Sequence, residues 1–283
     1  MNGRQRGIAL ISVLLVMSLA LLITGGLLRS HHLSLQSSGQ QLLQMQLRQL
    51  ASDGETWALL LLRDALQDAE KPVERFQGWT AMAPGFDVED AQIRIDIDDL
   101  AGRFNLNALL RQGQVDQVTL NRWARLLELL ELPPLQLSQV GPLEELSQLR
   151  LLPGIDARLL QRLEPWVALL PTETALNINT APALLLRALG EVDAATADAL
   201  ARQAATTPWA SVQAFTQDPL LSGQGLSNHG LGTQSRWYRI RVQVTRDGRE
   251  LRLATDVGHD PKARQLTVLQ RRFLPMSSHE RPR

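Results

Sequence analysis

The uncharged stretch IALISVLLVMSLALLITGGLL, residues 8–28, decides how the chain begins, with Arg4 and Arg6 before it and Arg29 after it. At about 1.5 Å per residue, a helix of this length spans roughly 30 Å, the thickness of a bilayer's hydrocarbon core. The stretch therefore predicts a transmembrane helix over 8–28. The basic residues before it favour an N-terminus that stays cytoplasmic, with the rest of the chain on the far side of the membrane.

Three interpretations of this stretch compete. A cleaved secretory signal peptide has a shorter apolar core and a small-x-small cleavage site, and this chain offers neither. A plain membrane anchor requires only the apolar run. In the third interpretation the short basic leader ends at Gly7, directly before the apolar helix, which resembles the type III signal of type IV pilins and type II secretion pseudopilins. That resemblance implies cleavage after Gly7 by a membrane peptidase and methylation of the new N-terminus, Ile8.

The helical pattern continues beyond the apolar stretch. Residues 33–66 contain no proline, and their apolar residues recur mostly at three- and four-residue steps, which predicts a long helix to about Leu66. Gly39 and Gly54 each weaken a helix by about 1 kcal/mol, so a kink or a short break there fits the sequence. Lys71-Pro72 is expected to end the helix, and 78–85 to form a loop.

Strand patterns flank a helical region. AQIRIDIDDL, residues 91–100, alternates isoleucine with polar residues and predicts a half-buried strand. RWYRIRVQVTRDGRELRLATDV, residues 236–257, predicts two strands joined through Asp247-Gly248, and QLTVLQRRF, residues 265–273, predicts a third. Between these strand regions the pattern is almost entirely helical. The expected N-caps of the helices there are Asp156, Thr180 and Asp193.

A single strand separated from its partners indicates an insertion. The predicted fold class is α+β, with a long N-terminal transmembrane, pilin-like helix, a small antiparallel sheet, and a large all-helical domain inserted between the first and later strands. The expected division is a leader peptide at 1–7, the transmembrane helix at 8–28, the pseudopilin helix and first strand at 29–105, the inserted helical domain at 106–232, the sheet strands at 233–274 and a disordered tail at 275–283.

Composition excludes several classes of function. The chain has 283 residues, no cysteine, and 29 basic and 29 acidic side chains. A disulfide scaffold, a thiol nucleophile and a thiolate metal site are therefore excluded. The formal charge of zero argues against a chain that binds polyanions over its whole surface.

The sequence offers little support for an enzyme. It contains no G-x-S-x-G elbow, P-loop or H-E-x-x-H motif. Two adjacent positions on one strand face, Asp96 and Asp98, could bind a cation or act as paired carboxylates, but a solvated strand face is the simpler interpretation. The remaining polar candidates are expected to be exposed or interfacial histidines and turn or capping asparagines: His31, His32, His229, His259, His279, Asn105, Asn107, Asn177 and Asn179.

Four further segments resemble one family. They are ASDGETWALLLLRD, DLAGRFNLNAL, LRLLPGIDARLLQRLEPWVALLP and LNINTAPALLLRAL. Together with the Gly7 leader, they are similar to the K-type minor pseudopilin of the bacterial type II secretion system. The resemblance implies a pseudopilin helix and sheet with a helical insertion. It also implies a place at the tip of a periplasmic pseudopilus that moves folded substrates toward an outer-membrane pore, bound to the I-type and J-type minor pseudopilins.

The fifth residue of the expected mature chain fits this resemblance. Most pilin-like subunits carry glutamate there, which pairs with the N-terminal amine of a neighbouring subunit, because an unpaired buried charge is costly. This chain has Ser12. K-type members characteristically lack the glutamate, and a subunit at the tip has no neighbour above it to pair with. The simpler alternative is a membrane anchor without a carboxylate.

One family feature is not carried over. Members commonly have an acidic, calcium-binding loop in the helical domain. The acidic residues between Trp123 and Leu149 are Glu128, Glu131, Glu144 and Glu145. Calcium needs six to eight converging oxygens, and these positions form no such cluster in the sequence. We therefore expect no metal and no cofactor.

The competing function is DNA binding. LRLLPGIDARLLQRL resembles a helix-hairpin-helix motif, in which Arg150, Arg158 and Arg162 would supply cations to a phosphate. However, residues 106–232 hold 8 arginines and 12 acidic residues, a net charge of −4, whereas a phosphate-binding module should be basic. The motifs are therefore interpreted as helix-packing elements.

The sequence thus predicts a non-enzymatic, single-pass protein of the inner membrane of a Gram-negative envelope, with a cytoplasmic N-terminus and a periplasmic C-terminal domain. Its role would be to initiate pseudopilus assembly for export of folded proteins across the outer membrane. Its expected partners are the I-type and J-type minor pseudopilins, the prepilin peptidase that cuts at Gly7, and the inner membrane, with secreted substrates and the outer-membrane secretin as further contacts and no nucleic acid. The alternative is a membrane-anchored helix-hairpin-helix protein for DNA binding or uptake.

Overall fold

A computed structural model describes residues 3–67, 86–88, 90–111, 114–135, 137, 143–152 and 154–274. At 3–12, 28, 31–37 and 111 only the backbone is described. The expected helix end at Lys71-Pro72, the loop at 78–85 and the tail at 275–283 lie outside the described residues. The chain divides into two compact units, Met1–Leu50 and Ala51–Arg283, and each is described by itself.

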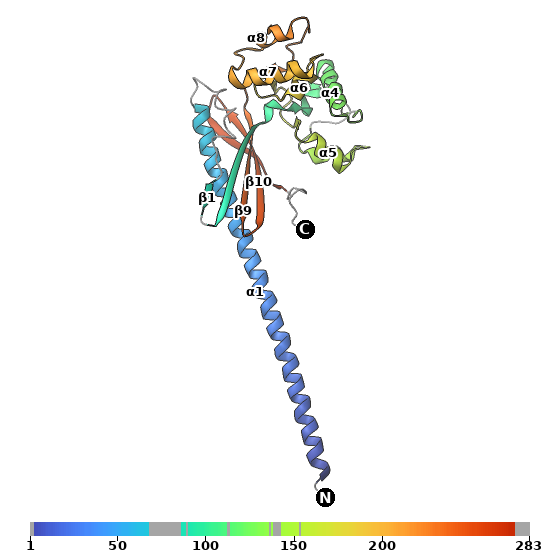
Figure 1. Cartoon of the computed structure of the whole chain (residues 1–283), viewed down its shortest axis with the longest axis vertical. Coiled ribbons are helices and arrows are strands. Elements are labelled where there is room, and N and C mark those ends of the chain that lie inside the picture. The colour runs from blue at the N-terminus through green and yellow to red at the C-terminus, as the bar shows by residue number, and fades with distance from the viewer. Residues whose placement is uncertain are drawn as a thin grey trace. The chain divides into compact units, whose positions relative to one another are not determined.

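Helix α1 (Gly3–Gln67) forms the first unit and continues into the second (Figure 1). It passes through Gly39 and Gly54 without the break that the sequence allowed. In the apolar stretch, the hydroxyls of Ser18 and Thr24 each donate to the carbonyl four residues earlier at 2.8 Å, so these polar groups are satisfied within the helix. Within the part of the chain that the structure describes, no helix has both the length and the apolar character needed to cross a membrane.

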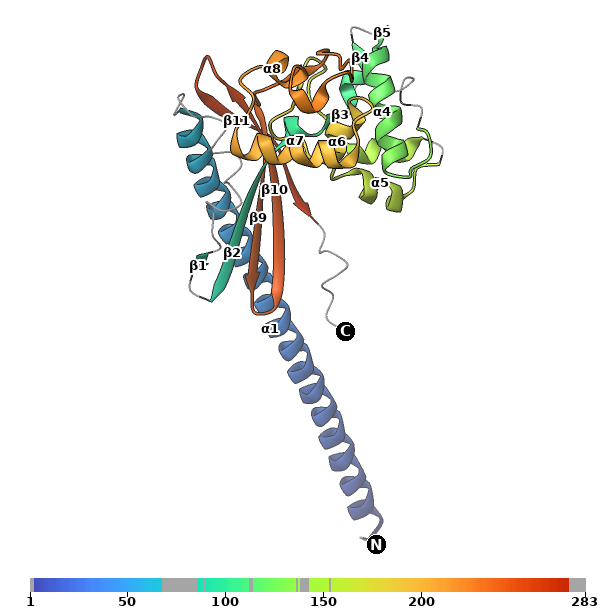
Figure 2. The same ribbon diagram turned by 45° about the horizontal axis from the view of Figure 1, so that its top comes forward.

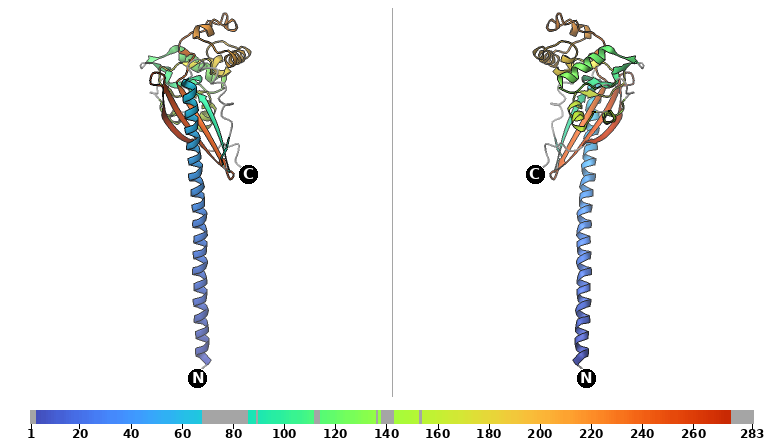
Figure 3. Two further views of the ribbon diagram at one scale, coloured as in Figure 1. Left: turned by 90° about the vertical axis from the view of Figure 1, so that its left-hand side faces the viewer. Right: turned by 90° about the vertical axis from the view of Figure 1, so that its right-hand side faces the viewer.

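The second unit contains a sheet of five antiparallel strands covered on one face by the end of α1 (Figure 3). The strands follow the order β1-β2-β9-β10-β11. Their bounds are β1 (Phe86–Val88), β2 (Ala91–Asp99), β9 (Trp237–Arg246), β10 (Arg249–Asp260) and β11 (Gln265–Leu274). The α+β class with a small antiparallel sheet is therefore confirmed, and β1 is a short strand that the sequence did not predict.

Close packing holds α1 on the sheet. The helix buries Ala51, Ala58 and Leu62 against the alternating apolar face of the strands. Gly54 lies at the closest approach, since a Cβ there would stand 2.8 Å from Cγ1 of Val242. Small residues on this helix face thus allow the helix to lie directly on the sheet.

The predicted strand patterns are confirmed in detail. Ile93, Ile95 and Ile97 are buried, and the polar residues between them lie on the other face. The hairpin between β9 and β10 turns at Asp247-Gly248, where both residues have positive φ, 50° and 70°. Such a turn matches the twist of the flanking strands, which is why Asp-Gly identifies it in the sequence.

Residues 100–236 lie between β2 and its sheet neighbour β9, and Figure 2 shows their helices gathered at one end of the sheet. The helices are α4 (Gln117–Leu129), α5 (Ala157–Leu163), α6 (Ala183–Ala188), α7 (Ala194–Thr206) and α8 (Val212–Thr216). Short 3₁₀ turns are η1 (Leu100–Gly102), η2 (Leu106–Leu109), η3 (Leu146–Leu151) and η4 (Pro219–Leu221).

The expectation that this segment is all helical is wrong in one respect. It also contains three pairs of two-residue strands, β3 (Phe104–Asn105) with β6 (Val167–Ala168), β4 (Leu110–Arg111) with β5 (Gln114–Val115), and β7 (Leu176–Asn177) with β8 (Leu231–Gly232). The physical reason is that most of these pairings join distant segments through one or two backbone hydrogen bonds. No periodicity of side chains accompanies so short a strand.

The inserted segment contains two copies of one structural motif. Each copy starts with a strand carrying Asn-x-Asn, at Asn105 and at Asn177, and ends with a strand that pairs parallel to the first. A Val-Asp-x-x-Thr sequence, at 115–119 and 192–196, caps α4 in the first copy and α7 in the second. In each cap the aspartate accepts from the threonine N–H, at 2.8 and 2.9 Å. The two copies share one apolar core that includes Trp123, Leu126, Leu149, Leu163, Leu185, Leu200 and Phe215.

Candidate functional site

The predicted processing site lies in α1. Gly7, Ile8 and Ser12 fall within the helix, and their side chains are outside the described part of the structure. Cleavage after Gly7, methylation of Ile8 and the role of Ser12 therefore stay predictions from the sequence.

A buried carboxylate, that of Asp99, lies at the junction of the sheet and the insertion. Asp99 ends β2, and its carboxylate accepts from the Ala101 N–H at 2.7 Å, Asn177 Nδ2 at 2.8 Å and the Thr180 hydroxyl at 2.6 Å. The Ser235 side chain also hydrogen-bonds to it. Burial raises the pKa of Asp99, and the hydrogen bonds partly oppose that rise. One carboxylate thus ties together the start of the insertion, its second copy and the return to β9.

This junction corrects one of the predicted helix caps. Asp156 and Asp193 cap α5 and α7 as expected, each accepting from a backbone N–H. Thr180 does not cap α6, because Pro182 occupies the N-cap position and the Thr180 hydroxyl donates to Asp99. A short hydroxyl side chain before a helix suits either role, so the sequence could not separate them.

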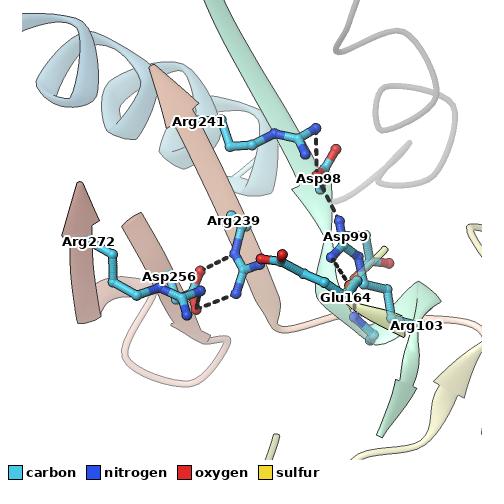
Figure 4. A network of polar contacts seen from close by, with 9 residues as sticks. Asp98, Asp99, Arg103, Glu164, Arg239, Arg241, Asp256 and Arg272 are labelled. Carbon is cyan, nitrogen blue, oxygen red and sulfur yellow. Dashed lines mark hydrogen bonds and ion pairs between the residues drawn. The ribbon is translucent and has the colours of Figure 1, made fainter. Parts of the chain in front are cut away.

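A row of ion pairs crosses the polar face of the sheet beside the junction (Figure 4). Asp98 accepts from Arg103 at 3.0 Å and lies 2.8 Å from Arg241. The sequence suggested that Asp98 lies on a solvated strand face, but in the structure its carboxylate is held by two ion pairs. It is neutralised by two guanidinium groups, so it is also not one member of an acid–base pair with Asp96.

The row continues across the next strands. Arg239 donates twice to Asp256, at 2.6 and 2.8 Å, and Arg272 stands 3.6 Å from the same carboxylate. Burial lowers the pKa of Arg239, but its bonds and charge contact with Asp256 raise it above its usual value. These pairs join β9, β10 and β11, and each cation has a fixed acidic partner.

Two cavities lie near these ion pairs, and polar side chains that already have hydrogen-bond partners line them. One of about 60 Å³ lies between the insertion and the sheet and is lined by Glu144, Glu164 and Arg239. An open cleft of about 430 Å³ adjoins Asp99, which accepts from the Thr180 hydroxyl, and Arg103, which donates to Asp98. This arrangement positions the insertion on the sheet.

Two of the four asparagines, Asn105 and Asn177, form turns as predicted, and the other two bridge distant segments, which the sequence did not predict. Asn105 and Asn177 each accept from the N–H two residues ahead, at 3.1 Å in both cases. Asn107 binds both the N–H and the carbonyl of Leu143, and Asn179 binds both backbone groups of Trp209. The side-chain amide replaces a neighbouring strand, which explains how such short segments are held.

One histidine has a structural role. His229 pairs with Asp116 at the start of α4, and the adjacent Arg122 donates to the carbonyls of Ser227 and His229 at 2.8 and 2.6 Å. These contacts fasten the loop before β8 to the first copy of the insertion. Burial lowers the pKa of the half-buried His259. The side chains of His31 and His32, and the whole of His279, lie outside the described residues.

The hairpins that resembled DNA-binding motifs make contacts within the insertion. At the first, Arg162 donates to the carbonyl of Leu130, while Arg150 and Arg158 are exposed. At the second, a Cβ on Gly190 would lie only 2.3 Å from Cδ2 of Leu226. The absence of a side chain at this glycine therefore lets Leu226 of the same chain pack against it.

The four glutamates named for the acidic loop do not converge. Glu128 and Glu131 stand at the end of α4, whereas Glu145 caps η3 and receives Ser147 Oγ at 2.9 Å. Within the described ranges, no three histidine, aspartate or glutamate side chains form a group suited to a metal ion.

Comparisons with known proteins agree on one family. The family model described as type II secretion system (T2SS), protein K matches residues 176–233, from β7 to just past β8. A type II secretion system protein K of Klebsiella pneumoniae is 33% identical over 267 residues, covering 78% of this chain and 82% of the relative. Another, of Pseudomonas aeruginosa, is 27% identical over 309 residues, covering 93% of this chain and 92% of the relative.

A solved structure shares the fold. A chain in the crystal structure of the GspK-GspI-GspJ complex from the type 2 secretion system of enterotoxigenic Escherichia coli superposes with a TM-score of 0.70, at 24% identity. The match covers 85% of this chain and 99% of the solved one. From the identity and coverage of the Klebsiella relative, the chain belongs to the type II secretion system protein K family.

Proposed function

We propose that this chain is a minor pseudopilin at the tip of the type II secretion pseudopilus. There it would initiate assembly with the I-type and J-type minor pseudopilins for the export of folded proteins across the outer membrane. Membership of the protein K family carries this proposal. The solved complex of similar fold supports it, because that complex contains GspK together with GspI and GspJ. The DNA-binding alternative gains no support from the net negative charge of the insertion.

The proposal includes a single-pass anchor in the inner membrane. Residues 8–28 form the anchor after the prepilin peptidase removes the leader 1–7, and the chain from residue 29 onward is periplasmic. The uncharged sequence of this stretch and its basic flanks support this part. The division of the periplasmic part at 105, 232 and 274 belongs to the same proposal.

The role is proposed to be non-enzymatic. Ser12 in place of glutamate suits a subunit with no neighbour above it, and the paired charges at the junction suit a rigid support for the insertion. The inserted segment would then cap the fibre, where secreted substrates and the outer-membrane secretin are candidate contacts.

Mass spectrometry of the mature N-terminus tests the proposal most directly. The full chain, produced with the prepilin peptidase, should begin at an N-methylated Ile8. An intact Met1, or cleavage near residue 30, would contradict it.

Substitution of the processing site gives a second test. Gly7→Leu should block processing and secretion, because the peptidase recognises the glycine. Gly3→Leu places the same side chain in the leader away from the cleavage site and should leave both intact. Normal processing of the Gly7 variant would remove the assigned site.

A further inference from the structure

An open pocket of about 420 Å³ lies in the insertion, where its two copies meet. Helix α4 of the first copy lines one side, and the turn between α6 and α7 of the second copy lines another. Figures 1 and 2 both show α4 beside α6. The loop before β8 contributes the remaining lining residues. The volume is within the range of about 300–1,000 Å³ that ligand pockets usually have.

One arginine in the wall of this pocket is buried. Arg122 is 6% exposed, and its two terminal nitrogens donate to the carbonyls of His229 and Ser227 at 2.6 and 2.8 Å. Its Nε is buried and has no hydrogen-bond partner within the described residues. Carbonyl groups carry no net charge, and the nearby Asp116 is paired with His229. The described residues thus fix a cation in the wall without bonding a carboxylate to it.

A second arginine lies one turn further along the same face of α4. Arg125 follows Arg122 by three residues, lines the same pocket and is half-exposed. Burial lowers the pKa of Arg122, the charge of Asp116 opposes this change, and the charge of Arg125 adds to it. Among the residues that the structure describes, none is ion-paired with Arg125. Two like charges therefore line this pocket, and one of them is free to bind a ligand.

The pocket is more positive than the segment around it. Two arginines and one exposed glutamate are its charged lining residues, a balance of +1: Arg122, Arg125 and Glu191. Residues 106–232 as a whole carry a net charge of −4. An anion in the pocket relieves the repulsion between the arginines, whereas the acidic surroundings repel a polyanion. The electrostatics therefore favour a ligand that carries a single negative charge.

The rest of the lining favours a peptide over a free ion. Val118, Leu189 and Leu226 are apolar and suit an apolar side chain. The amide side chains of Asn121 and Gln224 also line the pocket, and an amide can both donate to and accept from a peptide backbone. A small inorganic anion uses neither kind of group.

We propose that this pocket, formed by α4, the α6–α7 turn and residues 224–227, binds one carboxylate of an extended protein segment together with a neighbouring apolar side chain. Arg125 contacts the carboxylate, and Arg122 adds a fixed positive charge from the wall. Bonds between guanidinium and carboxylate are charge-assisted and often bidentate, which gives such a site orientation as well as affinity. The proposal adds a binding site to the assembly role and does not depend on that role.

Isothermal titration calorimetry of the full chain in detergent tests the proposal. The acidic probe is the peptide acetyl-Leu-Glu-Leu-amide, and the neutral probe is acetyl-Leu-Gln-Leu-amide. Sodium acetate is the probe for a free anion. We expect the acidic peptide to bind with a dissociation constant at least about tenfold lower than that of the neutral peptide or of acetate.

Substitutions assign the binding to the pocket. Arg125→Gln should weaken binding of the acidic peptide about tenfold, because it removes the charge-assisted bond, and Arg125→Lys should restore part of the affinity. Arg158→Gln removes an exposed arginine of α5 that does not line the pocket, so it is the matched control and should leave the affinity unchanged.

Three results would overturn the proposal. They are no binding of the acidic peptide, equal binding of the acidic and neutral peptides, and an unchanged affinity in Arg125→Gln. Binding of acetate as tight as that of the acidic peptide would overturn a protein segment as the ligand and leave a site for a free anion.

Chemical modification gives a second readout. Phenylglyoxal reacts with accessible guanidinium groups, and mass spectrometry of the digested chain reports the extent at each arginine. At a peptide concentration ten times the dissociation constant the site is free only about a tenth of the time, so modification of Arg125 should slow about tenfold. Modification of Arg158 should not change. An equal rate at Arg125 with and without the acidic peptide would overturn the assigned contact.

Discussion

Replacement of Asp99 by alanine should destabilise the second unit of the chain, Ala51–Arg283, more than any surface substitution. The buried carboxylate accepts four hydrogen bonds, from Ala101, Asn177, Thr180 and Ser235. Each donor left without a partner costs about 1 kcal/mol, and relief of the buried charge returns part of the total. We therefore expect a loss of about 3 kcal/mol, which for a unit of this size lowers Tm by roughly 6–12 °C.

Urea unfolding of the full chain in detergent, followed by tryptophan fluorescence, measures this loss. Trp237 begins β9 next to the junction and should report local opening. Thr180→Ala, which removes one donor, should cost about 1 kcal/mol. If Asp99→Ala costs less than Thr180→Ala, the carboxylate does not hold the junction and the reasoning is refuted.

The same residue predicts a dependence of stability on pH. Burial raises the pKa of Asp99 in the folded chain above the ordinary value of 3.8, so the folded state binds the proton more tightly than the unfolded state. Its contribution is therefore fully present below pH 3.8 and is lost as pH rises through the folded pKa. The free energy of unfolding of the wild-type chain minus that of Asp99→Asn, which cannot titrate, should fall over this window. A flat difference would contradict the raised pKa.

Five further substitutions test the packing. Gly54→Ala sets a methyl group 2.8 Å from a core valine of β9, a clash of about 1–3 kcal/mol that should outweigh the helix preference for alanine of about 1 kcal/mol, whereas Gly39→Ala meets no neighbour and should gain stability. Thermal unfolding of both variants tests the sign of each effect. Gly190→Ala should cost about 1 kcal/mol by pushing on Leu226, and Leu226→Ala in the same chain should relieve that clash. Asn179→Ala removes two hydrogen bonds to one backbone residue, at 3.1 and 2.9 Å, and should cost about 2 kcal/mol in urea unfolding.

The sheet could be predicted because its information is local. Alternation in 91–99 and the Asp-Gly turn at 247–248 specify face and pairing without reference to the rest of the chain. The caps at Asp156 and Asp193 follow in the same way from a side chain placed before a helix. The sequence indicated only that the lone strand at 91–99 has its partners beyond an insertion, and the structure shows that its neighbour there is β9.

The junction could not be predicted for the opposite reason. Asp98 and Asp99 are adjacent and identical in sequence, yet one is held by two arginines on the sheet face and the other is buried under the insertion. Strand geometry alone sends neighbours to opposite faces. What lies on each face depends in part on distant residues, such as Asn177, which is 78 positions from Asp99. A detectable signal was the repeat of Asn-x-Asn and Val-Asp-x-x-Thr, which would have shown that the insertion is built twice.

Basic and acidic residues are unevenly distributed between the insertion and the C-terminal strands. Residues 233–283 contain 12 basic and 5 acidic side chains, a net charge of +7, against −4 for residues 106–232. Arg239 and Arg272 are neutralised mainly by Asp256 of their own sheet, so the acidic insertion is not their chief partner. The excess of positive charge is therefore carried outward, including Lys262 and Arg264 in the turn before β11.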